Sequence, residues 1–437
     1  MKKSRGKLLS QKLTAFMAAF AVFSLTACGT GAPPKEDSTE GERIESEKPD
    51  DESSMSDGMY DLTTEEITLK MWDADEGGKK EMLEYAAEEF TKLYPNITFT
   101  FENVNHSDAS AKIALDAPAG VGPDVFCAAS DHMGNLVGSG LVLENQYAEN
   151  YKENYYSAAI NAASYEGKMY GYPISLETYV LFYNKDLIDS PPETWEEVIE
   201  IAKDFNNPAD NKYAIVWEVG DAYYDYMFTA AEGNYLFGDE GKDAASHNLN
   251  SEASVKGLTY FQDLRKEILD VPAGDLTWEF CMSEFSEGKA AMYITGAWSE
   301  TSFVEAGINY GVTTLPRLPE CENPATSFSG ARVMFVSSYS EHPKEAQAFL
   351  DFLCSREMIQ KRYEDVGELP SRSDIEITDE NDLAYVAQLE HSFAMPAIPE
   401  IGTFWASMGS AVKNIWDGTD VQEELDNAAS AMEAAVE

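Results

Sequence analysis

Basic side chains are scarce in this chain of 437 residues, which carries 31 Lys and Arg against 78 Asp and Glu. The formal net charge is −47. Proteins bind nucleic acid through basic surface that neutralises phosphates, so we expect no nucleic-acid partner. Polyanionic ligands are disfavoured for the same reason, whereas neutral and cationic ligands stay open.

Cysteine and histidine are also rare, with five of each. The histidines are scattered, and no two cysteines show the C-x-x-C spacing of a zinc site, so we predict no metal centre. The sequence does not pair the cysteines that lie far from the N-terminus, which are Cys127, Cys281, Cys321 and Cys354.

A partial calcium-loop pattern occurs once, at Asp73, Asp75, Gly78 and Glu84. Its fifth position is Gly77, which offers no side-chain ligand, and no helix is predicted before it. A strand-to-helix turn that presents polar groups to a cleft is the better interpretation.

Catalytic and nucleotide-binding motifs are missing too. No stretch matches a phosphate-binding loop, a dinucleotide fingerprint, a G-x-S-x-G elbow or an H-E-x-x-H motif. We therefore expect a protein without a cofactor that is not an enzyme.

The one long apolar run lies near the N-terminus, roughly from Leu13 to Leu25, behind a basic segment. It is too short for a good membrane-spanning helix. It leads into Leu25-Thr26-Ala27-Cys28-Gly29, which resembles a bacterial lipobox. We predict a signal peptide over 1–27 and a lipidated Cys28 that anchors the protein outside the cell membrane. An ordinary signal peptide with a chance cysteine is the alternative.

Residues 28–61 are rich in Gly, Ser, Pro and acids and contain a single aromatic residue, Tyr60. Such a segment buries too little apolar surface to offset the entropy of ordering. We interpret it as a flexible tether.

From about residue 65 the sequence alternates between strand-like and helix-like patterns. Ile67–Trp72 reads as a strand, and Met82, Ala86 and Phe90 recur at helical spacing behind it. Thr194-Trp195-Glu196-Glu197 is a capping box. Strands that alternate with helices predict α/β layers.

Short motifs spread over this region carry a family resemblance. The chain is similar to the extracytoplasmic solute-binding proteins of ABC importers, above all to the maltose and maltodextrin group. The matching stretches include Gly122-Pro123-Asp124-Val125, Gly171-Tyr172-Pro173-Ile174, Tyr183-Asn184-Lys185-Asp186-Leu187, Gly296-Ala297-Trp298, Met395-Pro396-Ala397-Ile398-Pro399 and Phe404-Trp405.

The resemblance implies a two-lobe α/β fold of the periplasmic-binding-protein type II class, with a ligand cleft between the lobes. Lobe 1 would comprise residues 62–176 and 330–372, and lobe 2 residues 177–329 and 373–437. The protein would bind a neutral, maltodextrin-like oligosaccharide and deliver it to the importer's membrane permease, and we expect a monomer.

The resemblance also assigns ligand-binding residues. Asp131 and Glu177 would accept hydrogen bonds from sugar hydroxyls, as would Asp221. Aromatic rings would pack on the sugar faces, and Asp75 or Glu76 would reach the ligand from the first turn. The aromatic candidates are Tyr223, Trp298 and Trp405. A core role is the alternative for Glu177 and Trp298, and a turn cap near Gly134 is the alternative for Asp131. Asp221 and Tyr223 could instead belong to an aromatic cluster with Tyr224 and Tyr226.

Three positions depart from the family pattern. Ala128 and Gly409 stand where a tryptophan and an arginine occur, and His132 replaces a second arginine. The ligand could therefore be another neutral oligosaccharide. Two further functions stay open, namely a receptor for a cationic solute, suggested by the acidic charge, and a carbohydrate-active enzyme with two cleft carboxylates.

Glu177 poses the sharpest question, because it interrupts the apolar stretch Tyr172–Asn184. A buried carboxylate without partners is costly. We expect this stretch to cross between the lobes and to direct Glu177 into the cleft.

Overall fold

A computed structural model describes residues 60–75 and 77–436, apart from the side chain of Glu232. The predicted signal peptide, Cys28, nearly all of the tether and Glu76 lie outside the described residues. The chain divides into two compact units, residues 1–61 and 62–437, and all the described strands and helices belong to the second. Within the described part, no helix has the length and apolarity needed to cross a membrane.

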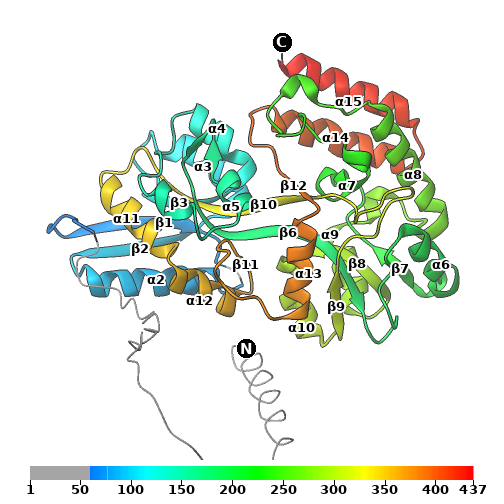
Figure 1. Ribbon diagram of the computed structural model, residues 1–437, viewed down its shortest axis with the longest axis horizontal. Helices are drawn as coiled ribbons and strands as arrows, with labels where there is room; N and C mark the ends of the chain where they lie inside the picture. The colour runs from blue at the N-terminus through cyan, green and yellow to red at the C-terminus, as the bar shows by residue number, and fades with distance from the viewer. Residues whose placement is uncertain (1–59, 76, 437) are drawn as a thin grey trace, which may run out of the picture. The chain divides into compact units, whose positions relative to one another are not determined.

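The described strands and helices alternate over most of the second unit (Figure 1). The strands are β1 (Ile67–Asp73), β2 (Ile97–Asn103), β3 (Val125–Ala129), β4 (Ser164–Tyr165), β5 (Lys168–Met169), β6 (Tyr172–Asn184), β7 (Tyr213–Val216), β8 (Ala290–Gly296), β9 (Tyr310–Thr313), β10 (Ser327–Val336), β11 (Leu369–Pro370) and β12 (Ser392–Ala394). The α-helices are α2 (Lys79–Leu93), α3 (His106–Asp116), α4 (Met133–Gly138), α5 (Ser157–Ala162), α6 (Trp195–Phe205), α7 (Ala222–Thr229), α8 (Glu252–Ile268), α9 (Trp278–Ser286), α10 (Glu300–Ala306), α11 (Pro343–Leu353), α12 (Arg356–Val366), α13 (Glu380–Leu389), α14 (Ile401–Trp416) and α15 (Val421–Val436).

The first lobe is built on a parallel β1-α2-β2 unit. Ile67 of β1 pairs with Ile97 of β2, and Met71 pairs with Val125 of β3, both in parallel register. Ile67, Leu69 and Met71 are buried on one face of β1, as period-2 alternation predicts. Helix α2 buries Met82, Ala86 and Phe90, so the predicted strand and helix are both confirmed.

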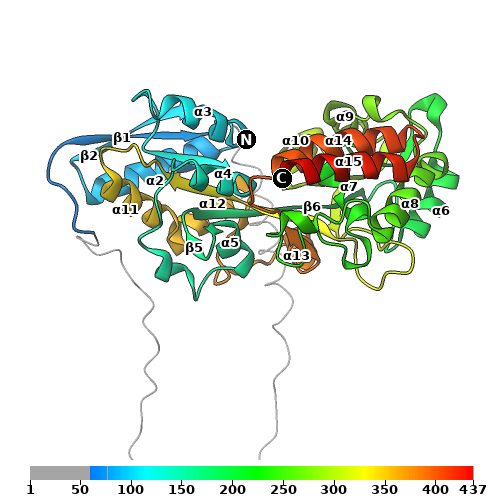
Figure 2. The same ribbon diagram turned by 90° about the horizontal axis from the view of Figure 1, so that it is seen from above.

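Strands β6 and β10 run antiparallel through the middle of the sheet, whose order is β2-β1-β3-β10-β6-β8-β7. The first part of β6, up to Thr178, pairs with β10. From Tyr179 onward β6 pairs with β8, and its last residues also pair with β9. One strand therefore serves both lobes, and in Figures 1 and 2 β6 runs from one group of helices to the other. The expected two-lobe α/β fold is confirmed.

The second lobe has an aromatic core. Trp195, Trp217 and Trp416 are fully buried, with ring centroids 5.7 Å apart in the first pair and 5.5 Å apart in the second. These rings bring together α6, the end of β7 and α14, which are distant in sequence. Each buried aromatic side chain removes a large apolar area from water, at about 25 cal/mol per Å².

The predicted capping box begins helix α6. The Thr194 hydroxyl accepts a hydrogen bond from the Glu197 backbone N–H at 3.2 Å. The Glu197 carboxylate accepts from the backbone N–H of Glu193 at 2.7 Å, one residue before the expected partner. Two backbone donors at the helix start are thus satisfied.

Candidate functional site

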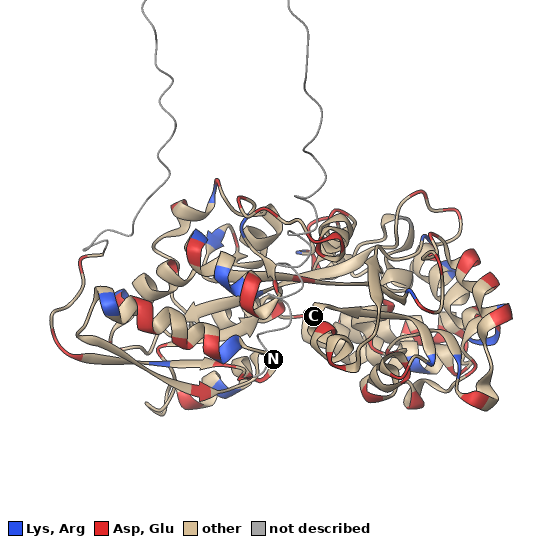
Figure 3. Cartoon of the chain, turned by 90° about the horizontal axis from the view of Figure 1, so that it is seen from below, with Lys and Arg blue, Asp and Glu red and all other residues tan. Residues whose placement is uncertain are grey.

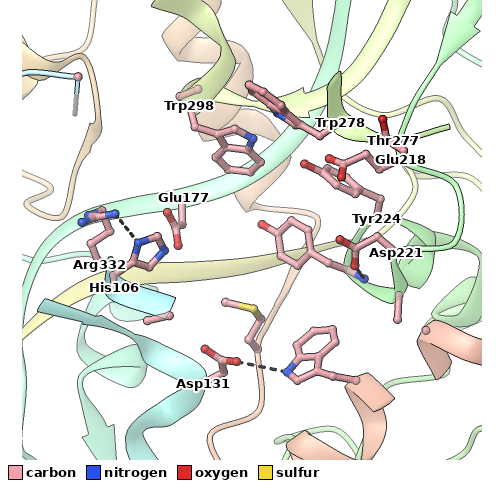
Figure 4. Close-up of a pocket in the computed structure, with 18 of the residues that line it drawn as sticks. His106, Asp131, Glu177, Glu218, Asp221, Tyr224, Thr277, Trp278, Trp298 and Arg332 are labelled. Carbon is pink, nitrogen blue, oxygen red and sulfur yellow. Dashed lines mark hydrogen bonds between the residues drawn. The ribbon is translucent and has the colours of Figure 1, made fainter. Parts of the chain in front are cut away.

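A cavity of about 1110 Å³ is lined by residues from both lobes. Its walls include β6 and β10, the helix starts of α3, α7 and α9, and helix α14 (Figure 4). Six of the sequence-predicted site residues line it, namely Asp131, Glu177, Asp221, Tyr223, Trp298 and Trp405. Asp75 is exposed and is not brought into the cavity, and Glu76 lies outside the described residues.

At the end of β1 the buried acid is Asp73, whereas Asp75 is exposed. The Asp73 carboxylate is buried and accepts a hydrogen bond from the backbone N–H of Ala74 at 2.8 Å. It also pairs with Arg332 at 2.6 Å. Among the described residues, no group of three or more His, Cys, Asp or Glu side chains is arranged to hold a metal ion.

Glu177 lies on β6 opposite Gly330 of β10, two residues before β6 changes partner. A Cβ atom at Gly330 would lie 3.7 Å from Glu177 Cγ and only 2.5 Å from Met395 Cε, so the glycine leaves room for both side chains. Within the described part of the chain, the Glu177 carboxylate has no hydrogen-bond partner. Burial raises the pKa of Glu177, while Arg332 and Lys79 partly oppose this shift.

Three aromatic residues face the same cavity. The Trp298 side chain is 40% exposed, which is high for tryptophan, and it folds back over Gly296. A Cβ atom at Gly296 would lie 2.1 Å from the Trp298 ring, so only glycine allows this orientation. Tyr223 lies next to Trp298, with ring centroids 6.4 Å apart.

Trp405 and Asp131 meet across the cavity. The Trp405 indole N–H donates to Asp131 Oδ2 at 3.3 Å, which joins α14 of the second lobe to the end of β3 in the first. Phe404, the neighbour of Trp405, is buried. One ring therefore anchors α14 in the core and the other faces the cavity.

Asp221 lines the cavity and also caps a helix. It is the N-cap of α7, and its Oδ1 accepts from the Tyr223 backbone N–H at 2.9 Å. Asp221 is accessible to solvent within the cavity, yet the protein around it displaces enough bulk water to raise its pKa. The Lys413 ammonium partly opposes the shift, and the Lys413 stem lies over Gly220 beside it.

Sequence reasoning missed a charged group at the first-lobe end of the cavity. Arg332 of β10 is buried, and its guanidinium contacts Asp73, His106 and Glu368. The nearby guanidinium groups of Arg362 and Arg332 lower the pKa of Glu368 to about 2, despite burial. In the sequence, the one sign of this charged group is Arg332 itself, an arginine within the apolar stretch of β10.

A second missed group lies at the other end. Glu218, Thr277 and Trp278 line the cavity, and Trp278 is 40% exposed. Burial and the charge of Asp221 raise the pKa of Glu218 to about 7. Thr277 caps helix α9 by accepting from the Phe280 backbone N–H at 3.3 Å, which places Trp278 in the first turn.

Of the three departures from the family pattern, one lies on the cavity wall. Gly409 lines it, and a Cβ atom there would meet nothing within 4 Å. Ala128 is buried in β3 and is not part of the lining. Acids beside exposed aromatic rings remain, and this combination suits a ligand with both hydroxyl groups and apolar C–H faces.

The sequence and structure are similar to known proteins. Residues 85–390 match the model of the bacterial extracellular solute-binding protein family. The chain is 33% identical to the galactooligosaccharide-binding protein of Bacillus subtilis over 74% of this chain and 79% of that protein. It is 28% identical to a maltooligosaccharide ABC transporter solute-binding lipoprotein of Streptococcus pneumoniae, over 86% and 90% of the two chains.

Solved structures give the same picture. A cyclo/maltodextrin-binding protein complexed with maltotetraose superposes with a TM-score of 0.77 at 30% identity, covering 85% of this chain and 97% of the other. A maltose-binding protein of Listeria monocytogenes in complex with maltose gives 0.75 at 28% identity, covering 85% and 98%. Both similarities span the two lobes and the cavity between them.

Proposed function

The chain belongs to the bacterial extracellular solute-binding protein family, and from this premise we propose that it is a non-catalytic receptor for a neutral oligosaccharide of an ABC importer. The observation that carries the proposal is the cavity, in which acids from both lobes and aromatic rings from the second lobe face one space. Ionised acceptors form hydrogen bonds of about 1.5–3 kcal/mol, and aromatic faces bury the apolar side of a pyranose.

Each predicted residue then has a role. Asp131 accepts sugar hydroxyls from the first-lobe side, Glu177 does so from the crossing strand β6, and Asp221 does so from the start of α7. Trp298, Trp405 and Tyr223 provide surfaces for sugar rings. Glu218 and Trp278 extend the same chemistry toward the second lobe, so the cavity accommodates more than one sugar unit.

Maltodextrins are the first candidate ligands, because relatives and solved neighbours are named for them. Galactooligosaccharides are the second, since a relative named for them shares 33% identity. Gly409, which stands where the family resemblance implies an arginine, lies on the cavity wall and supports a pocket of altered shape. Sugar titrations decide between the two candidates.

We infer the cellular setting from the same premise. Lipidation at Cys28 anchors the protein outside the cell membrane, and a tether over residues 28–61 gives it reach. The lobes comprise residues 62–176 with 330–372 and residues 177–329 with 373–437. The liganded protein, a monomer, delivers its sugar to the importer's permease.

Isothermal titration with maltotetraose and a galactotetraose tests the proposal. We expect heat from at least one sugar and an affinity that changes little between low and high salt, because the ligand is neutral. An affinity that falls steeply with salt, seen with a polyamine instead, would favour a cationic solute. Heat from no sugar would overturn the proposal, and steady release of reducing ends would identify an enzyme.

A further inference from the structure

His106 opens helix α3 at the first-lobe end of the cavity. It follows Asn105, whose side chain caps the helix by accepting from the Ser107 backbone N–H at 3.1 Å. The imidazole is half-buried and lines the cavity. Figure 4 shows it beside Glu177, joined to Arg332 by a hydrogen bond.

The partner of His106 fixes where its ring proton lies. Arg332 Nη1 lies 3.0 Å from His106 Nδ1. A guanidinium has donors and no acceptor, so His106 Nδ1 must accept and carries no proton. The neutral ring therefore holds its proton on Nε2. That nitrogen has no hydrogen-bond partner in the described part of the chain.

Arg332 is held in place by two acids, which keeps this arrangement rigid. Its Nη2 donates to Asp73 Oδ1 at 2.6 Å, and its Nε lies 3.6 Å from Glu368 Oε1. Glu368 is fixed in turn by Arg362, at 2.8 Å from Nε and 2.6 Å from Nη2. The Arg332 side chain is 3% exposed, so it contacts His106 and not bulk solvent.

Charges around the ring keep it neutral. Burial and the cations Arg332 and Lys79 lower the pKa of His106 to about 3. Asp73 and Glu368 act in the opposite direction and are outweighed. At any physiological pH the ring thus presents one donor and no positive charge.

We propose that His106 determines specificity as a fixed hydrogen-bond donor to a sugar oxygen, and that Arg332 is the positioning residue that sets its tautomer. The cavity is otherwise rich in acceptors, namely Asp131, Glu177, Glu218 and Asp221. A sugar hydroxyl that donates to Glu177 can accept from His106, so the pair recognises an oxygen at one position. This inference rests on the proposed oligosaccharide binding.

The tautomer is tested in the ligand-free full chain by nitrogen NMR of labelled histidine, with His106→Gln identifying the signal. We expect a protonated Nε2 and an unprotonated Nδ1 from pH 5 to 8. Arg332→Lys keeps a cation beside Asp73 and removes the planar donor, so it should shift His106 toward a mixture of tautomers. A proton on Nδ1 in the wild-type chain would overturn the inference.

Sugar titrations test the contact. His106→Phe keeps a flat ring without the donor and should weaken binding by about tenfold. His106→Gln retains an N–H at the ε position and should recover part of the loss. His342→Gln, a half-buried histidine outside the cavity lining, is the matched control and should bind like the wild type.

The outcomes separate the two proposals. A wild-type chain that binds no oligosaccharide overturns the proposed function and this inference with it. A wild-type chain that binds, together with a His106→Phe variant of equal affinity, overturns this inference alone. A monodeoxy sugar that loses affinity for the wild type and not for His106→Phe identifies the oxygen that His106 contacts.

Discussion

At the scale of single residues, Glu177 shows that an acid on a cavity wall does not need the protein partner that an acid in a closed core needs. In a closed core its charge would require a partner. On the cavity wall it is half-buried, and water or ligand hydroxyls can solvate it. We predict that Glu177→Ala weakens sugar binding by more than about 1.5 kcal/mol while the unfolding midpoint changes little. Calorimetry and thermal unfolding measure the two effects.

Glu177→Gln is the matched control, because it keeps the shape and one acceptor oxygen. It should bind more weakly than the wild type and more tightly than Glu177→Ala. A Glu177→Ala variant that unfolds easily yet binds normally when folded would show that this acid is structural.

The raised pKa of Glu218 predicts that sugar binding depends on pH. Its pKa is raised to about 7, so it is largely protonated at pH 5.5 and ionised at pH 8. The ionised form is the stronger acceptor, and we expect affinity to rise by about threefold to tenfold over this range. Titrations across the range should show a smaller rise in Glu218→Gln. Glu177 and Asp221, whose pKa values are also raised, account for what remains.

Glu218 also makes the free energy of unfolding depend on pH, and this contribution falls as pH rises, whereas the sugar affinity increases. The folded chain holds a proton on Glu218 that the unfolded chain releases near pH 4.5. The contribution of Glu218 to the free energy of unfolding is therefore complete below pH 4.5 and is lost as pH rises through about 7. Glu218→Gln should flatten this part of the profile. An unchanged profile would mean that Glu218 titrates normally.

Sequence reasoning reached residues of the cavity wall where the local pattern is distinctive. Glu177 interrupts an apolar run, and Trp298 and Trp405 follow recognisable motifs, so all three could be named. His106 and Arg332 could not, because 226 positions separate them and only folding brings them together. Asp221 was named for ligand binding, and its capping bond to the Tyr223 N–H was not foreseen.

At the scale of elements, local patterns predicted β1, α2 and the start of α6 well. They did not predict how long the shared strands are. Strand β10 extends over Ser327–Val336 because its first part pairs with β12 and β6. The ends of such strands depend on which strands they pair with, and the residues of one strand alone do not determine its partners.

Helices α7 and α8 pack closely because of one glycine. A Cβ atom at Gly257 in α8 would lie 2.0 Å from the backbone oxygen of Phe228 in α7. We predict that Gly257→Ala lowers the free energy of unfolding by about 1–3 kcal/mol, despite alanine's better helix propensity. Because α7 carries Tyr223, sugar affinity should fall as well.

Gly402 in α14 is the control for this substitution, since a Cβ atom there would meet nothing within 4 Å. Gly402→Ala should be neutral or stabilise by up to about 1 kcal/mol. Denaturant unfolding of both variants tests the argument. Equal effects would mean that helix propensity, and not close packing, dominates at Gly257.

At the scale of the whole molecule, charge and architecture act separately. Asp and Glu residues are spread over helices of both lobes (Figure 3), and only some of them line the cavity. A net charge far from zero favours solubility in proteins generally and does not select a neutral ligand. Under the proposed function, selection comes from the cavity, and closure depends on the strands that join the two lobes.

The lobes are joined by β6 and β10 and meet across the cavity at Trp405 and Asp131. A ligand that bonds to both walls favours the closed arrangement by its extra contacts there. We predict that saturating sugar lowers the radius of gyration measured by small-angle X-ray scattering. It should also stabilise the fold by about 2.7 kcal/mol at a hundred times Kd.

Glu177→Ala separates closure from unspecific compaction, because it removes a ligand contact on the crossing strand β6 and leaves the backbone of the chain crossings intact. At a sugar concentration that saturates the wild type, this variant should stay expanded, and it should become compact only at higher concentration. An unchanged radius of gyration in a wild-type sample that calorimetry shows to be saturated would contradict closure. The sugar would then bind to one wall, and mutations on the opposite wall, such as Trp405→Ala, should leave its affinity unchanged.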